Sequence, residues 1–179
     1  IGDQERVRAR IMASLSDPRG DVRAAATSAV ATLPSATEAL SGLEKAATDP
    51  SPRVRLSAFD ALAHEFSARL RPRSDSEVDA GILDRLVSLA LAGAKDPSAQ
   101  VRLSGVDLLA TLGDDARARD GLVVAVSNGS DSVCLRAAAR LLALDPKLAY
   151  AAWTQAEPSG RTLKAFGRSL ALHVGKGSH

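Results

Sequence analysis

The heptapeptide DPSPRVR, residues 49–55, recurs along the chain in related forms. Close copies are DPRGDVR at 17–23 and DPSAQVR at 96–102, and a weaker one is NGSDSVC at 128–134. Successive copies begin 32, 47 and 32 residues apart, the long interval carrying about 15 additional residues around 69–76. A fifth, degenerate copy begins at Glu157-Pro158. Self-similarity at this period predicts a repeated supersecondary unit.

Each copy reads as the beginning of a helix. We expect its aspartate to be the N-cap and the following proline to occupy the first helical position, where a missing N–H costs nothing. Apolar residues follow the heptapeptide at helical spacing and predict a stripe that faces the core. In the first and third copies this stripe consists of Ala26, Ala29, Val30, Leu33, Gly105, Leu108, Leu109 and Leu112.

A second predicted helix precedes each copy. Capping boxes begin at Ser35 and Ser74, and no segment alternates with the period of two that marks a strand. We therefore expect an all-α fold of helical hairpins. The preceding helices are predicted over 4–15, 37–47, 78–94, 116–126 and 147–155, and the hairpins over 3–33, 35–70, 77–113, 115–145 and 147–174, with 175–179 read as a linker or tag remnant.

An aspartate followed five and six residues later by Val-Arg resembles the hallmark of the HEAT-repeat family, including its bacterial lyase-like branch. The resemblance implies a right-handed α-solenoid of about five HEAT-like hairpins. It also implies a structural ladder, in which the arginine of one repeat bonds to turn acids of its neighbours. The ladder residues would be Asp17, Arg23, Asp49, Arg55, Asp96 and Arg102. The fourth copy departs from the pattern with Asn128 and Cys134, so we expect its junction to be less firmly tied.

The composition limits the compartment and the class of partner. The 179 residues are 45% hydrophobic and 25% charged with a net charge of +2, an ordinary composition for one globular domain. No apolar run reaches the roughly 18 residues of a membrane span. A single cysteine favours a reducing, cytoplasmic setting. The small basic surplus and the five aromatic residues disfavour a nucleic-acid binder.

Candidate catalytic and metal-binding residues are few. His64-Glu65 resembles one of the dyads that hold two irons in HEAT-like deoxyhypusine hydroxylases, but those sites need four dyads and this chain has one. Cys134 occupies a ladder position with no histidine placed predictably near it, which favours a buried filler over a nucleophile. We expect no catalytic residue, no metal and no cofactor.

The second helices would line the concave face of such a solenoid. Positions two, six and nine residues after each valine lie opposite the core stripe, so Ala24, Ala31, Ala63 and Leu142 are expected to be exposed there. The same positions give a partner-binding row, which side-chain packing could alternatively bury: Leu56, Asp60, Leu103, Asp107 and Leu135. The predicted function is a non-catalytic scaffold or regulatory domain whose partner is a protein segment with apolar anchors and positive charge. The alternatives are a bilin-lyase-like enzyme or enzyme subunit and a DNA-glycosylase-like nucleic-acid binder.

Overall fold

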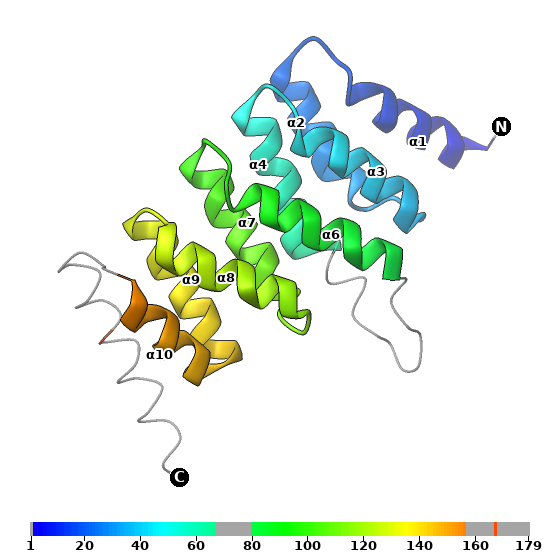
Figure 1. The fold of residues 1–179 in the computed structure, drawn as a ribbon. Coiled ribbons are helices and arrows are strands. Elements are labelled where there is room, and N and C mark those ends of the chain that lie inside the picture. Colours follow the sequence, from blue (N-terminus) through cyan, green and yellow to red (C-terminus); the bar gives the residue numbers. More distant parts are fainter. Residues whose placement is uncertain (1, 67–79, 157–166, 168–179) are drawn as a thin grey trace. The chain divides into compact units, whose positions relative to one another are not determined.

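The computed structural model describes residues 2–66, 80–156 and 167, and within them every regular element is a helix. This confirms the all-α prediction. The elements are α1 (Asp3–Ser14), α2 (Gly20–Val30), α3 (Ala36–Ala47), α4 (Pro52–Asp60), the π-helix η1 (Ala61–Phe66), α6 (Ala80–Gly93), α7 (Ala99–Thr111), α8 (Ala116–Asn128), α9 (Asp131–Leu144) and α10 (Pro146–Gln155) (Figure 1).

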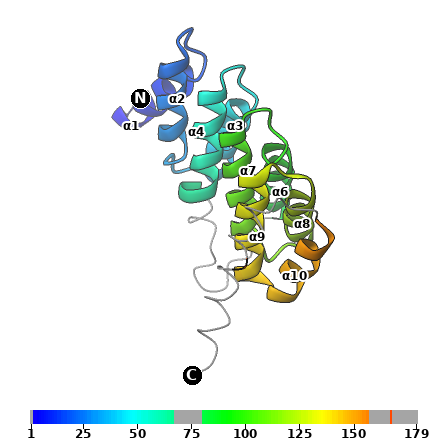
Figure 2. The same ribbon diagram turned by 90° about the vertical axis from the view of Figure 1, so that its left-hand side faces the viewer.

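The chain divides into two compact units, Ile1–Leu108 and Leu109–His179. In the first unit, α1, α3 and α6 lie in one layer and α2, α4 and the beginning of α7 lie in the other (Figures 1 and 2). Helix α3 packs against both α2 and α4, which also pack against each other. Consecutive helices therefore alternate between the layers, as helical hairpins require.

Alanine, valine and leucine side chains fill the space between the layers of the first unit. Val30, Leu40, Leu43, Leu62 and Leu86 are completely buried. Of the predicted stripe, Ala26, Val30, Leu33, Gly105 and Leu108 are buried, while Ala29 is half-buried. Apolar residues at the spacing of one helical face thus do form the core, since that is how an amphipathic helix removes apolar area from water.

Glycine permits the closest helix contact of the first unit. A Cβ on Gly105 would lie 2.4 Å from the backbone nitrogen of Ala94 and 2.5 Å from the carbonyl carbon of Gly93. The end of α6 and the middle of α7 therefore approach each other backbone to backbone. Any larger residue at position 105 would separate them.

The predicted helix starts at the repeated motif are wrong by two or three residues. The N-cap residues of α2 and α4 are Arg19 and Ser51 rather than Asp17 and Asp49. The aspartates instead form turns of their own, because the Oδ1 atom of each accepts from the N–H two residues ahead, at 2.8 Å in both cases. Pro18 and Pro50 consequently lie in these turns. Ser35 is the N-cap of α3 as predicted, and its hydroxyl accepts from the Glu38 N–H, which is one of the two bonds of a capping box.

The second unit contains α8, α9 and α10, which pack against one another. Its core includes the fully buried Leu122 and Leu141 and the nearly buried Trp153. Helix α10 has the start that we expected elsewhere, with Asp145 as the N-cap and Pro146 in the first turn. The Asp145 carboxylate accepts from two backbone N–H groups, those of Lys147 and Leu148, both at 3.0 Å.

Several predictions lie outside the described residues. These are the inserted segment at 69–76, the capping box at 74–77, the degenerate fifth copy from 157 onward and the terminal segment 175–179. Among the helices that are described, none has both the length and the apolar character needed to cross a membrane.

Candidate functional site

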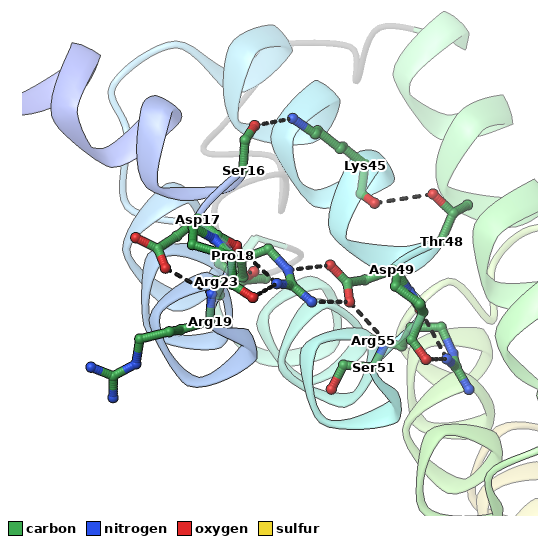
Figure 3. A network of polar contacts seen from close by, with 12 residues as sticks. Ser16, Asp17, Pro18, Arg19, Arg23, Lys45, Thr48, Asp49, Ser51 and Arg55 are labelled. Atoms are coloured by element: carbon green, nitrogen blue, oxygen red, sulfur yellow. Dashed lines mark hydrogen bonds and ion pairs between the residues drawn. The ribbon is translucent and has the colours of Figure 1, made fainter.

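Two arginines of the repeated motif form forked ion pairs with the aspartate of the next copy, and Figure 3 shows the pair of Arg23 with Asp49. Arg23 donates from Nε and Nη2 to the two carboxylate oxygens of Asp49, at 2.7 and 3.0 Å. Arg55 binds Asp96 with the same two distances. The side chains are only 9–16% exposed, so both pairs are largely shielded from water. Bidentate, charge-assisted geometry of this kind fixes orientation as well as adding energy.

The third nitrogen of each arginine closes the turn of its own copy. Nη1 of Arg55 donates to the backbone oxygens of Asp49 and Pro50, at 2.9 and 3.2 Å. Arg23 does the same with the oxygens of Asp17 and Pro18 (Figure 3). Each guanidinium thus joins its own turn to the following one. This surface of the first unit is occupied by structural contacts.

The aspartates of these pairs are held in the ionised form. Hydrogen bonding from Arg23 holds the pKa of Asp49 below its ordinary value, against a smaller opposing effect of burial. Burial acts most strongly on Asp96 and would raise its pKa, but hydrogen bonds from Arg55 and from the Ser98 N–H together outweigh it and lower the pKa. Both carboxylates therefore remain charged in mildly acidic solution.

The ladder changes at its later copies. Arg102 closes its own turn through Nη1, which donates to the oxygens of Asp96 and Pro97 at 2.7 and 2.9 Å. At the next aspartate and arginine positions the chain has Asn128 and Cys134, and Cys134 is buried. Sequence reasoning missed Arg119, whose Nη1 closes the turn before α8 by donating to the Gly113 oxygen at 2.8 Å. The sequence signal that could have identified Arg119 is its separation of six residues from Gly113, the same separation as that from Arg55 to Asp49.

A second set of polar contacts joins α1, α3 and α6, and sequence reasoning missed it too. Arg85 of α6 pairs with Glu44 of α3, its Nε lying 2.7 Å from Oε1. Arg8 of α1 pairs with Glu38 of α3 at 3.2 Å. Each arginine is the sixth residue of its helix, but Arg8 lies 9 residues and Arg85 lies 11 residues before the next motif aspartate, so the repeated motif does not mark them.

The predicted partner-binding residues are only partly exposed. Leu56 and Leu103 are half-buried in the first unit, and Leu135 is half-buried in the second. The Asp60 side chain is exposed, and Asp107 is half-buried.

The expectation of exposed alanines on this face is wrong, because Ala24, Ala31 and Ala63 are all buried. Leu142 is buried as well. A second helix packed against neighbours on both sides buries more than the stripe that faces the first helices.

A pocket of about 380 Å³, lined mostly by residues with polar side chains, lies between α2 and the continuous helix formed by α4 and η1. The residues that line it are Ser28, Thr32, Ser57, Asp60, Ala61 and His64. On the second helix these residues are spaced by three, four and seven positions, which places them along one face. The pocket thus includes one predicted partner-binding residue, Asp60, and the histidine that the sequence analysis had set aside.

The Asp60 carboxylate is oriented from the neighbouring helix. The Ser104 hydroxyl of α7 donates to its Oδ1 atom at 2.5 Å, and Ser104 itself is buried. Oδ2 has no hydrogen-bond donor among the residues that the structure describes. Asp60 therefore presents a fixed, charged acceptor at the pocket.

Metal-binding groups do not gather in the described segments. There, no three side chains of histidine, cysteine, aspartate or glutamate lie close enough together to hold an ion. Cys134, the nucleophile considered above, is buried within α9.

Comparison with known proteins gives no match, either to protein-family models or to curated proteins.

Proposed function

We propose that the chain is a HEAT-like repeat protein, a right-handed solenoid of about five helical hairpins, that acts as a non-catalytic scaffold. Its binding surface is the face of the second helices, and its partner is a protein segment with apolar anchors and positive charge. Three complete copies of the Asp…Val-Arg pattern support the family assignment. The forked pairs Arg23–Asp49 and Arg55–Asp96 are the contacts that such a ladder requires.

One observation carries the binding surface: a leucine and a carboxylate lie together on each of two successive second helices. These are Leu56 with Asp60 on α4, and Leu103 with Asp107 on α7. The leucines retain some exposed area, while the carboxylate of Asp60 is open to solvent. Apolar anchors beside negative charge suit a partner with leucine-like side chains and arginine or lysine.

The test replaces both leucines, Leu56→Ser with Leu103→Ser, after a partner has been identified with the native protein. We expect binding of the purified partner to fall about tenfold or more, since two apolar anchors are lost. The matched control is Val7→Ser, which removes an apolar side chain that is 59% exposed in the first-helix layer. Unchanged affinity of a folded double variant would overturn the proposal. An equal loss of affinity in the Val7→Ser control would show that the partner binds to another face of the protein.

Melting temperature separates binding from folding in this test. If the double variant loses its helical circular dichroism or melts many degrees lower, the leucines belong to the core and this face is not the binding surface.

A further inference from the structure

We propose that the pocket between α2 and α4–η1 receives a single arginine side chain of the partner segment. This inference rests on the proposed protein-binding function and names the group that the first unit would recognise. Its occupant follows from the chemistry of the lining, the size of the pocket and the irregular helix beneath it.

The lining offers acceptors and one negative charge. Besides Oδ2 of Asp60, the hydroxyls of Ser28 and Ser57 have no hydrogen-bond partner in the described part of the chain. The Thr32 hydroxyl donates to the Ala29 carbonyl, so its oxygen can act toward a ligand only as an acceptor. No lysine or arginine lines the pocket. A cation with several donors satisfies this set, whereas an anion would meet the carboxylate.

The arrangement of the acceptors selects a guanidinium over an ammonium. Ser28 and Thr32 come from α2 and its C-terminal turn, while Ser57 and Asp60 come from α4, so the acceptors stand on two sides of the pocket. Figure 2 shows these two helices side by side. A planar guanidinium has five donors in a fixed fork and can reach both sides at once. An ammonium is a compact point charge that prefers its water shell. The volume of about 380 Å³ is adequate for one such side chain.

The helix that carries Asp60 changes form at the pocket. Helix α4 ends at Asp60 and continues directly as the π-helix Ala61–Phe66. Residues 61, 62 and 63 are all buried, and His64 then emerges at the rim with an exposed side chain. A π-helical turn is rare and is frequently found at functional sites. The irregularity thus coincides with the pocket and supports a ligand there.

The test uses N-acetyl-arginine methylamide as the probe, titrated into ¹⁵N-labelled protein and followed by NMR. We expect amide shifts confined to residues around Ser28, Ser57, Asp60 and His64. The neutral isostere N-acetyl-citrulline methylamide should give no such shifts at the same concentration, because it lacks the charge. The lysine analogue should bind several-fold more weakly.

Variants locate the site. Asp60→Asn keeps the shape and an acceptor for Ser104 but removes the charge, and should weaken the arginine probe about tenfold or more. Ser28→Leu fills the pocket from the opposite helix and should also abolish binding. The matched control is Asp3→Asn, which removes an exposed carboxylate of α1 in the same unit and should leave probe binding unchanged.

The proposal is overturned by equal shifts with citrulline, by shifts centred elsewhere, or by full binding to folded Asp60→Asn protein. Binding of the lysine analogue equal to that of arginine would overturn the choice of guanidinium. Because the probe needs no partner protein, failure here is distinct from failure of the scaffold function, which the two leucine substitutions test.

Discussion

Equivalent turns of the two units are built from different chemistry. In the first unit, Arg55 pairs with the aspartate of the next copy and closes its own turn at the same time. In the second unit, the equivalent arginine position holds the buried Cys134, while Asp115 and Asp145 cap helices locally. The arginine position of the motif thus carries a shielded ion pair in the first two copies and a small buried side chain in the fourth, where the aspartate position is also changed, to Asn128. The first unit depends on geometry between copies, and the second depends more on local caps and apolar packing.

The largest effect should come from the close backbone contact of the first unit. Gly105→Ala places a Cβ against backbone atoms of residues 93 and 94, which cannot rotate away. We expect a loss of about 3 kcal/mol in unfolding free energy, at the upper end for overpacking. The second unit offers a matched change, Gly113→Ala, which meets mainly the terminal atoms of the partly exposed Leu144 side chain.

Because a leucine side chain can move, Gly113→Ala should cost less than about 1 kcal/mol. Urea unfolding followed by amide NMR signals from each unit measures both changes. Similar losses for the two variants would show that the close contact at Gly105 is more tolerant than its geometry implies.

The second-largest loss of stability should come from breaking the ladder of arginine–aspartate pairs. Arg55→Ala should lower the unfolding free energy of the first unit by about 1–3 kcal/mol, because a shielded, charged hydrogen-bond pair is lost and Asp96 is left without its partner. Arg19→Ala is the matched control, since Arg19 is largely exposed and pairs only with nearby Asp21. The control should melt at the native temperature. A melting temperature of Arg55→Ala equal to that of the control would contradict the ladder.

Acid should weaken the first unit through the same residues. The folded pKa values of Asp49 and Asp96 lie below the unfolded value of about 3.9, so their contribution is present above that pH and is lost as pH falls through the folded values. Asp115 of the second unit also has a lowered pKa, chiefly through its hydrogen bond from Arg117. That pair is local, and its arginine is 52% exposed, so its contribution should be smaller.

Amide exchange measured from pH 6 down to about pH 2.5 distinguishes the units. Protection of Val54 and Ala58 should fall earlier than that of Leu122, and Arg55→Ala should flatten the dependence of the first two. An identical decline in both units, unaffected by Arg55→Ala, would remove the ladder aspartates as the cause.

Much of the fold follows from local residue patterns. Apolar spacing predicted the helices correctly, including one over 116–126 that is found at Ala116–Asn128. The starts of the helices were harder to predict, because the sequence shows an aspartate in the same way whether it forms a turn or caps a helix. The position of the helix start distinguishes the two: α4 begins at Pro52, three residues after Asp49, whereas α10 begins at Pro146, directly after Asp145.

The candidate site was harder to predict for the same kind of reason. Asp60 was identified by its position on the helix face, but its contact with Ser104 depends on how α4 and α7 pack. The π-helix after Asp60 has no sequence signature that we recognised, so His64 was weighed only as a metal ligand. The burial of Ala31 and Ala63 reflects neighbouring helices on both sides, which a single-helix projection omits.

The two forked pairs close chain segments of different length. Arg23 and Asp49 are 26 residues apart, and Arg55 and Asp96 are 41 apart, yet the distances within the pairs are the same. Lengthening a closed loop by this ratio costs roughly 0.4 kcal/mol of chain entropy, since the cost grows only with the logarithm of length. A forked pair therefore tolerates chain segments of quite different length between its arginine and its aspartate, so the number of residues between two copies of the motif can differ while their turns remain joined.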